Sequence, residues 1–275
     1  MTNRESWKKF AKRQAAWEKK YSKRFLAIIR RNNKAFVYKL TSLENAKEVA
    51  DMTVLPISYR QTMIDLYKGA SIPQAKEVYR ETRAKAVKFT GMGRDELWIS
   101  DVVNYLETHG LDLLTQKIAD TQKKILIKLI QQGIDEGLSY DQIVKNILTN
   151  PVWVSNAMRI ARTESNRAMN YGHMVGAAAL NFKSDKVWIA ARDRRTRGTK
   201  PKDKADHYHM NEQRVGYDSA FTDPRSGVSL MFPGDPSAPP ADTVNCRCRV
   251  IFEPVRSNGK LIPKQPSLPQ LSTIL

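Results

Sequence analysis

The character of the sequence changes at Asn181, and this change constrains the fold more than any other feature of the chain. Before it, apolar residues recur at intervals of three, four and seven, which is the periodicity of amphipathic helices. After it, short runs with strand character alternate with loops rich in Gly, Pro and Asp. The strand candidates are residues 186–192, 213–217 and 248–252. The sequence therefore predicts an α+β protein with a mostly helical N-terminal body and a small β-rich C-terminal cap.

The same change in composition divides the chain into four consecutive parts. Residues 1–40 are predicted to form a basic amphipathic N-terminal arm, and residues 41–180 a helical body. Residues 181–254 are predicted to form a small α+β cap that ends with an Asn-Cys-Arg-Cys motif. Residues 255–275 form a Pro-rich tail, which we expect to be extended.

Glycine and proline mark the expected helix ends in the first half of the body. We expect breaks near Pro56 and over residues 69–73, where these residues interrupt the apolar pattern. A further helix is expected from about residue 95 to 106. The long amphipathic helix that follows is expected to end at Gly133 or Gly137, because glycine is the preferred residue just after a helix.

The second half of the body carries more specific local signals. Ser139 and Gln142 have the spacing of a capping box, which predicts that a short helix begins there. The next helix is expected over residues 155–180, and within it we interpret Glu164 and Arg167 as an ordinary ion pair. This helix carries small residues that suit close packing against neighbours: Ala157, Ala161, Ala168, Gly172, Gly176 and Ala177.

The N-terminal arm has the pattern of a basic amphipathic helix. Large apolar residues fall on one face: Trp7, Phe10, Trp17, Tyr21, Phe25 and Ile28. Basic residues surround them: Lys8, Lys9, Lys12, Arg13, Lys19, Lys20, Lys23 and Arg24. Two interpretations stay open. In one, the apolar stripe packs on the rest of the chain and the lysines are solvated. In the other, the arm docks on a partner protein or lies along DNA phosphates.

The charge of the chain indicates a polyanionic partner. The net charge is +18, and its distribution is uneven: residues 1–40 carry +11, residues 41–150 carry −1, and residues 151–275 carry +8. The positive charge lies at both ends of the chain, on either side of a middle part that is nearly neutral. Binding to nucleic acid or to an acidic protein surface explains this distribution better than solubility alone.

The same composition argues against several other classes of protein. No apolar run approaches the roughly 20 residues that a membrane-spanning helix needs, so no membrane partner is expected. The first residues lack the apolar segment of a secretory signal. The two cysteines of the chain cannot form a disulfide framework, so a reducing intracellular compartment fits best.

Four residues of the cap suggest a metal site. His207 and His209 are two positions apart, and so are Cys246 and Cys248, in segments that we interpret as extended. Residues at i and i+2 of a strand point to the same face, so two adjacent strands would gather two imidazoles and two thiols. Zinc is the cofactor that such a ligand set suits. In the alternative, the cysteines pack as small apolar residues beside a buried polar network of Asp193, Arg197 and Asn245.

A series of short motifs runs through the C-terminal half in a fixed order. It comprises Arg162 and Glu164 within Ala-Arg-Thr-Glu; Trp188; Asp193, Arg195, Thr196 and Arg197; His207 with Met210 and Asn211; Phe232, Pro233, Gly234 and Asp235; and Asn245, Cys246, Arg247 and Cys248. Together they resemble the signature of the Mu F-like minor head proteins of tailed bacteriophages, the phage head morphogenesis family. The resemblance covers about residues 110–253. The stretch over 198–206 is longer than usual in the family, so His207 and His209 both compete for the family's histidine position; the residues that follow favour His207.

The resemblance implies a structural role. Such proteins are present in few copies inside the capsid near the portal, take part in head assembly, and in some cases leave with the DNA. The implied partners are the portal protein, double-stranded DNA bound without sequence preference, and a scaffold or major capsid protein. The implied location is the interior of the virion, after assembly in the host cytoplasm.

The sequence also allows a second function of a different class. Asp193, His207, His209 and Asp235, beside the basic loop after Asp193, could form the site of a metal-dependent nuclease or a phosphate-binding transferase. The chain lacks a Gly-rich phosphate loop, a Gly-x-Ser-x-Gly elbow and a His-Glu-x-x-His helix. The sequence therefore favours a protein that is not an enzyme.

Overall fold

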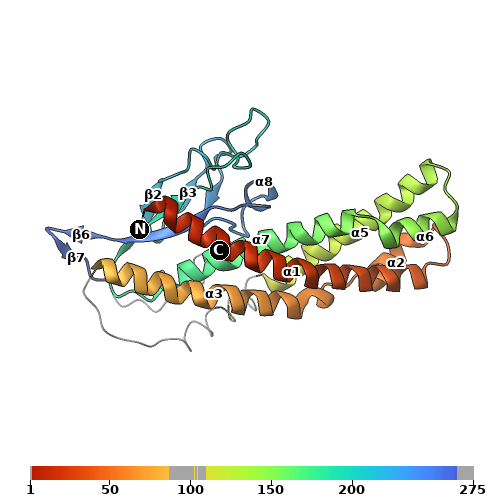
Figure 1. The fold of residues 1–275 in the computed structure, drawn as a ribbon, viewed down its shortest axis with the longest axis horizontal. Coiled ribbons are helices and arrows are strands. Elements are labelled where there is room, and N and C mark those ends of the chain that lie inside the picture. Colours follow the sequence, from red (N-terminus) through yellow and green to blue (C-terminus); the bar gives the residue numbers. More distant parts are fainter. Residues whose placement is uncertain (1, 87–101, 103, 105–109, 265–275) are drawn as a thin grey trace. The chain divides into compact units, whose positions relative to one another are not determined.

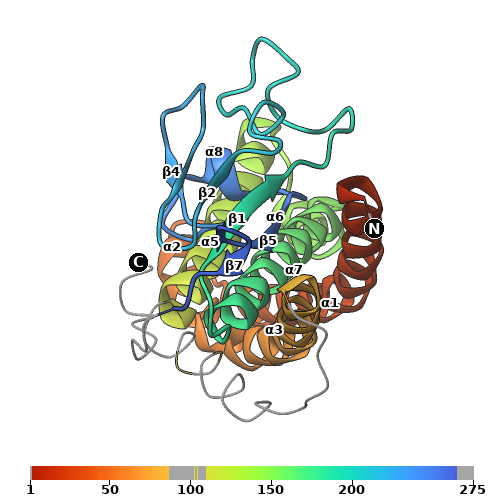
Figure 2. The ribbon, with the colours of Figure 1, turned by 90° about the vertical axis from the view of Figure 1, so that its left-hand side faces the viewer.

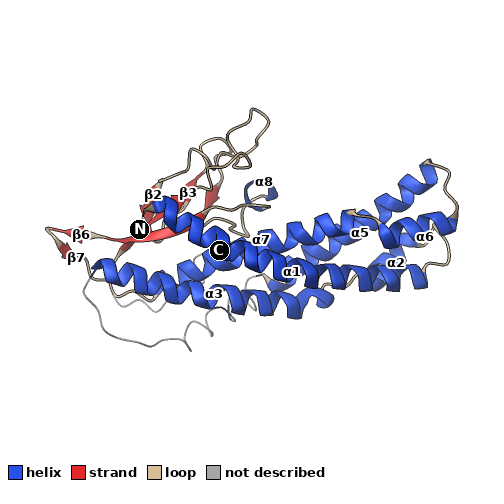
Figure 3. Ribbon diagram, viewed as in Figure 1, coloured by secondary structure: helices blue, strands red, loops and turns tan. Residues whose placement is uncertain are grey.

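The computed structural model of the protein describes residues 2–86, 102, 104 and 110–264. Helices form most of this described chain, and short antiparallel strands lie in its C-terminal part (Figure 3). The predicted α+β class is therefore confirmed. The helix expected over 95–106 falls almost wholly outside the described residues, as do residues 265–275 of the predicted tail. None of the described helices combines the length and the apolar character needed to cross a membrane.

Figure 1 colours the helices and strands by their position in the sequence. The helices are α1 (Asn3–Lys39), α2 (Ala46–Thr53), α3 (Ile57–Ala86), α5 (Leu111–Asp135), α6 (Tyr140–Thr149), α7 (Val152–Ala178) and α8 (Pro240–Thr243). The strands are β1 (Ser184–Ile189), β2 (Arg214–Gly216), β3 (Phe221–Thr222), β4 (Ser229–Leu230), β5 (Arg249–Pro254), β6 (Arg256–Ser257) and β7 (Lys260–Leu261).

Two compact units make up the chain, and each is assembled from separated segments. We call the first the sheet unit; it comprises Met1–Trp17, Leu66–Leu106 and Arg162–Leu275. The second, the helical unit, comprises Glu18–Asp65 and Glu107–Ala161. The boundaries between the two units fall inside the continuous helices α1, α3 and α7. No change in amino-acid composition therefore marks these boundaries. The four consecutive parts expected from the sequence stay a prediction.

A buried glutamine organises the centre of the helical unit. Gln122 of α5 accepts a hydrogen bond from Asn32 of α1 (3.1 Å) and another from the hydroxyl of Tyr59 of α3. Its amide nitrogen donates to the backbone carbonyl of Ile29 at 3.1 Å. Because a buried amide without partners costs free energy, these bonds fix how the three helices meet.

Helix α3 continues through the segment where we expected a break. The prediction of a break over 69–73 is wrong, because Pro73 lies inside the helix. The small residues of this segment serve close packing instead. A Cβ atom added at Gly69 would lie 2.8 Å from Trp17 of α1, so this glycine is needed for the two helices to approach. The break near Pro56 is confirmed, since α2 ends at Thr53 and α3 begins at Ile57.

A three-stranded antiparallel sheet in the order β2-β1-β5 lies in the sheet unit (Figure 2). Strand β1 pairs with β5 along its whole length, from Ser184 opposite Pro254 to Ile189 opposite Arg249. Val187 and Ile189 of β1 and Ile251 of β5 pack with Trp7 of α1 into one core cluster. The Trp7 indole also donates to the carbonyl of Arg247 at 2.9 Å. The start of the N-terminal arm is therefore a structural part of this unit.

Helix α7 supplies hydrogen bonds to the outer edge of β5. Asn170 donates to the carbonyl of Cys248 (3.0 Å) and accepts from the amide of Val250 (2.9 Å), as a neighbouring strand would do. One turn later, Nδ1 of His173 donates to the carbonyl of Val250 at 3.0 Å. Both side chains are fully buried. The helix therefore takes the place of a fourth strand.

We expect the buried His173 to make the protein less stable in acid. Burial, together with the positive charges of Arg249 and Arg13, lowers the pKa of His173 well below its ordinary value of 6.5. Below about pH 6.5, this histidine binds a proton in the unfolded chain but not in the folded chain. The free energy of unfolding therefore falls by up to about 1.4 kcal/mol for each pH unit by which the pH is lowered. Urea unfolding at about pH 7.5 and about pH 5.5 checks this, with His173→Gln as the comparison. The same acid-induced loss in wild type and His173→Gln would contradict it.

Candidate functional site

The Asp-x-Arg-Thr-Arg motif forms a turn that holds the strand entering β5. The Asp193 carboxylate accepts the backbone amide of Arg195 at 2.9 Å, and the amide of Asp193 donates to the Thr196 hydroxyl at 3.0 Å. The same carboxylate forms a two-point ion pair with the guanidinium of Arg247. The hydrogen bonds from Arg247 and Arg195 lower the pKa of Asp193 to about 2. Arg197 donates to the carbonyl of Val244.

The Pro-Gly-Asp motif connects the cap to helix α7. Arg167 of α7 donates to the carbonyl of Gly234 at 2.7 Å and pairs with both carboxylate oxygens of Glu164 at 2.7 and 2.8 Å. The predicted ion pair is thus confirmed and is buried. Asp235 is buried and accepts from the amides of Met231 (2.7 Å) and Ser237 (2.9 Å). Gly234 and Asp235 therefore both have structural partners.

The Asn-Cys-Arg-Cys segment is attached to α7 at its first residue. The amide of Asn245 donates to the Thr163 hydroxyl at 3.0 Å, and its side-chain oxygen accepts from Arg162 at 3.2 Å. Asn245 has a φ of 59°, a left-handed conformation that asparagine tolerates better than most residues. This bend brings the following two cysteines into the interior.

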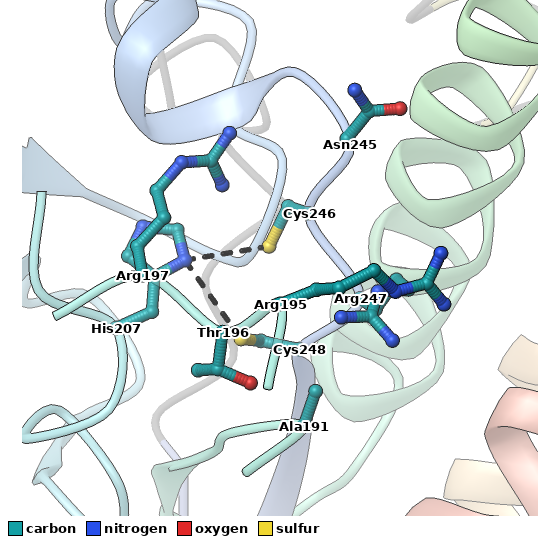
Figure 4. A pocket seen from close by; sticks show the side chains of 9 residues that line it. All are labelled: Ala191, Arg195, Thr196, Arg197, His207, Asn245, Cys246, Arg247 and Cys248. Atoms are coloured by element: carbon teal, nitrogen blue, oxygen red, sulfur yellow. Dashed lines mark hydrogen bonds between the residues drawn. The ribbon is translucent and has the colours of Figure 1, made fainter. Parts of the chain in front are cut away.

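Both thiols converge on one histidine. Nδ1 of His207 lies 3.6 Å from Sγ of Cys246 and 3.8 Å from Sγ of Cys248. All three side chains are buried. Figure 4 shows the two sulfur atoms directed at the same ring nitrogen. Cys246 and Cys248 lie in the extended segment before β5, so the expectation that both point to one side holds for the cysteines.

The two thiols differ in acidity. The pKa of Cys246 lies well below its usual value, chiefly because its sulfur accepts a hydrogen bond from Cys248. The neighbouring His207 and Arg197 lower it further. Burial and the nearby Cys246 raise the pKa of Cys248 well above the usual value.

His209 does not join this cluster. Residues 207–212 form turns and not a strand, so the expectation of an extended His207-Tyr208-His209 segment is wrong. The turn rotates His209 outward, where its side chain is 64% exposed and its Nδ1 lies 2.8 Å from Asp206. The structure thus brings together three of the four expected metal ligands. It also favours His207 over His209 as the histidine of the motif.

Two carboxylates near His207 were missed at the sequence level. Carboxylate oxygens of Asp223 and Asp242 and a ring nitrogen of His207 all lie within 4.8 Å of one another, and the three residues are buried. Asp223 accepts the amides of Arg225 (2.8 Å) and Ser226 (2.9 Å). The sequence Asp-Pro-Arg-Ser-Gly signals such a turn but not a place beside a histidine.

The residues named for the nuclease alternative do not come together in one metal-binding cluster among the described residues. Asp193 and Asp235 are occupied by Arg247 and by backbone amides, and neither belongs to a cluster of metal-binding groups among the described residues. The carboxylates that approach His207 are other residues.

The basic residues of α1 divide into two groups. Lys9 and Arg13 pair with Glu77, and Arg24 pairs with Asp65 at 2.7 Å. The other basic residues predicted to contact a partner are exposed: Lys8, Lys12, Lys19, Lys20 and Lys23. On the opposite side of the helix, Phe10, Tyr21 and Phe25 are almost completely buried. The apolar stripe therefore packs within the protein.

Residues 124–251 match the model of the family described as Phage Mu protein F like protein. The matched segment begins within α5 and ends within β5, so it includes every motif described above. No curated protein and no solved structure gave a significant match. The family match confirms the resemblance drawn from the motifs, and over residues 124–251 the chain is similar to the Mu F-like phage head morphogenesis proteins.

Proposed function

We propose that this protein is a minor capsid protein of a tailed phage that binds inside the head near the portal and contacts the packaged DNA. The observation that carries the proposal is the family match over residues 124–251, which supports a head morphogenesis protein. The proposed role is structural. A scaffold or major capsid protein is a further proposed partner during assembly in the host cytoplasm. We also propose that the protein leaves with the DNA during ejection, and this part rests on the family alone.

The distribution of charge supports the DNA contact. Packaged DNA is a dense polyanion, and lysines and arginines that approach its phosphates gain free energy by releasing bound counterions. The net charge is +18, and residues 1–40 contribute +11 of it. In the sheet unit, the loop after β1 adds exposed basic residues: Arg194, Arg195, Lys200, Lys202 and Lys204.

Portal binding is tested by co-sedimentation of the purified protein with purified portal rings. We expect co-sedimentation at both low and moderate salt, because a specific protein interface does not depend on charge alone. Immunolabelling of opened and intact virions locates the protein independently. A protein that stays in the supernatant with portal rings and labels the outside of intact virions would contradict the proposal.

DNA binding is tested by its salt dependence, with four exposed lysines of α1 as the variable. Replacing Lys8, Lys12, Lys19 and Lys23 by alanine should flatten the slope of log affinity against log salt by up to about 3–4, since each phosphate contact contributes about 0.9. Affinity should not depend on sequence. Filter binding on unrelated duplexes at several salt concentrations measures both quantities.

The control removes the same charge elsewhere. Lys117, Lys124, Lys128 and Lys145 are exposed on α5 and α6, and their fourfold alanine variant has the same net charge as the α1 variant. A smaller change of slope in this control supports a contact through α1. Equal changes in the two variants would show that only the total charge matters, and binding that is insensitive to salt would contradict the DNA contact altogether.

A further inference from the structure

We propose that Cys246, Cys248 and His207 bind one zinc-class metal ion, with the two sulfur atoms and Nδ1 of His207 as ligands. The two cysteines are the only ones in the chain, and both face the same ring nitrogen (Figure 4). This site is independent of the proposed role in the phage head, and its test does not require head assembly.

The distances between the ligand atoms match a tetrahedral ion. Zinc binds imidazole nitrogen at about 2.0–2.1 Å and thiolate sulfur at about 2.3 Å, which places neighbouring N and S ligand atoms about 3.6 Å apart. The observed separations from Nδ1 of His207 are 3.6 Å to Cys246 and 3.8 Å to Cys248. A thiol-to-imidazole hydrogen bond has a similar length, but the single lone pair of Nδ1 can accept only one such bond well. An ion shared by all three atoms accounts for the convergence of both sulfurs.

The other nitrogen of the same ring provides a second, independent observation. Nε2 of His207 is buried and has no hydrogen-bond partner among the described residues. A histidine that binds a metal through one nitrogen almost always directs the other N–H at a carboxylate, carbonyl or water. Asp223 and Asp242 supply two buried carboxylates within 4.8 Å of a nitrogen of this ring. The cluster therefore contains the ligand set and the outer carboxylates of a histidine metal site.

The surroundings leave room for a fourth ligand. A cavity of about 10 Å³ adjoins the three ligand residues, which is close to the space that one water molecule requires. Arg195, Arg197 and Arg247 line the same cavity, so an isolated cation would be repelled there. Two thiolates neutralise the charge of a divalent ion. Sulfur ligands favour zinc-class metals, whereas magnesium and calcium prefer oxygen ligands and are disfavoured here.

Metal content of the purified, reduced protein tests the proposal. After incubation with zinc and removal of the excess, we expect about one zinc per chain by elemental analysis and native mass spectrometry. Cys246→Ser, Cys248→Ser and His207→Gln should each lose most of this zinc. The matched control is His209→Gln, because His209 lies two residues away but is exposed and paired with Asp206, and it should keep the full amount.

Cobalt provides a readout on the wild-type chain that does not depend on whether the variants fold. Cobalt in a site with two thiolates should give strong tetrahedral visible bands and a thiolate-to-cobalt charge-transfer band. Asp242→Asn should weaken metal affinity about 10- to 100-fold, as loss of an outer carboxylate does in other histidine sites. Unchanged affinity in Asp242→Asn would overturn the assignment of that carboxylate to the ring.

Three results would overturn the metal site. The first is wild-type protein that takes up no more zinc than Cys246→Ser. The second is loss of zinc from His209→Gln to the same extent as from His207→Gln. The third is wild-type protein with cobalt that shows no thiolate charge transfer, which would leave the two cysteines as a hydrogen-bonded thiol pair.

Discussion

Gly172→Ala is expected to lower the free energy of unfolding by about 3 kcal/mol or more, the upper end of the range for overpacking. A Cβ atom at position 172 would lie 2.2 Å from the carbonyl oxygen of Ser71 and 2.7 Å from its Cα atom. The obstacle is the backbone of α3, which cannot rotate away as a side chain can. The usual benefit of replacing glycine by alanine inside a helix, about 1 kcal/mol, is too small to compensate.

This expectation belongs to a contact between α7 and α3 that contains small residues on both sides. One helical turn beyond Gly172, a Cβ atom at Gly176 would lie 2.3 Å from the carbonyl oxygen of Ala75. Ser71 also donates its hydroxyl hydrogen bond to the carbonyl of Ala168 at 2.8 Å. Two helices in such close backbone contact must separate if either glycine gains a side chain.

Urea unfolding measures the loss, with Gly216→Ala as the control. Gly216 also lies in the sheet unit, but an added Cβ would meet nothing closer than the Ser219 hydroxyl at 3.6 Å. The control should therefore differ from wild type by less than about 0.5 kcal/mol. A Gly172→Ala protein as stable as the control would show that the helices can separate at little cost, and the close contact would then have no role in stability.

Asn170→Leu is expected to cost about 2–5 kcal/mol. The substitution keeps the branched shape of the side chain but removes the partners of the Cys248 carbonyl and the Val250 amide. Each buried backbone group left without a partner costs about 1–3 kcal/mol. The amide hydrogen of Val250 should also exchange faster with solvent, which hydrogen-exchange measurements can detect directly.

Asn156→Leu is the matched control for this experiment. Asn156 is also a buried asparagine of α7, but among the described residues its amide nitrogen has no hydrogen-bond partner, and its oxygen accepts from Arg159, an exposed residue. Removing it leaves no buried group unpaired, so we expect little change or a gain in stability. Equal losses in the two variants would mean that helix propensity or packing, and not the bonds to β5, determines the effect.

Local signals predicted the fold well wherever a few adjacent residues decide the structure. Ser139 and Gln142 form the expected capping box at the start of α6. Gly137 has a φ of 68° just beyond α5, in agreement with the expected helix end. The N-terminal cap of α1 was missed. Reciprocal bonds join Thr2 and Glu5 at this end of the helix, a Thr-x-x-Glu pair that has the same form as a capping box.

Tertiary contacts decided the features that the sequence predicted wrongly. Gly69 and Pro73 resemble helix breakers when only their neighbours are considered, yet Trp17 packs on the helix at Gly69. The site shows the same limit. The spacing of Cys246 and Cys248 predicted that both thiols share one side, whereas Asp223 and Asp242 reach His207 through loops whose path no periodicity specifies.

The bonds from α7 to β5 also affect how the protein behaves among many other chains. An edge strand with free amides and carbonyls can template the addition of a strand from another molecule, which is a route to aggregation. In the described part of the chain, Asn170 and His173 occupy these groups on β5, and the opposite edge of the sheet is the three-residue strand β2. Little of this described edge is left on which a foreign strand could grow, so we expect the sheet to resist strand addition even at high protein concentration.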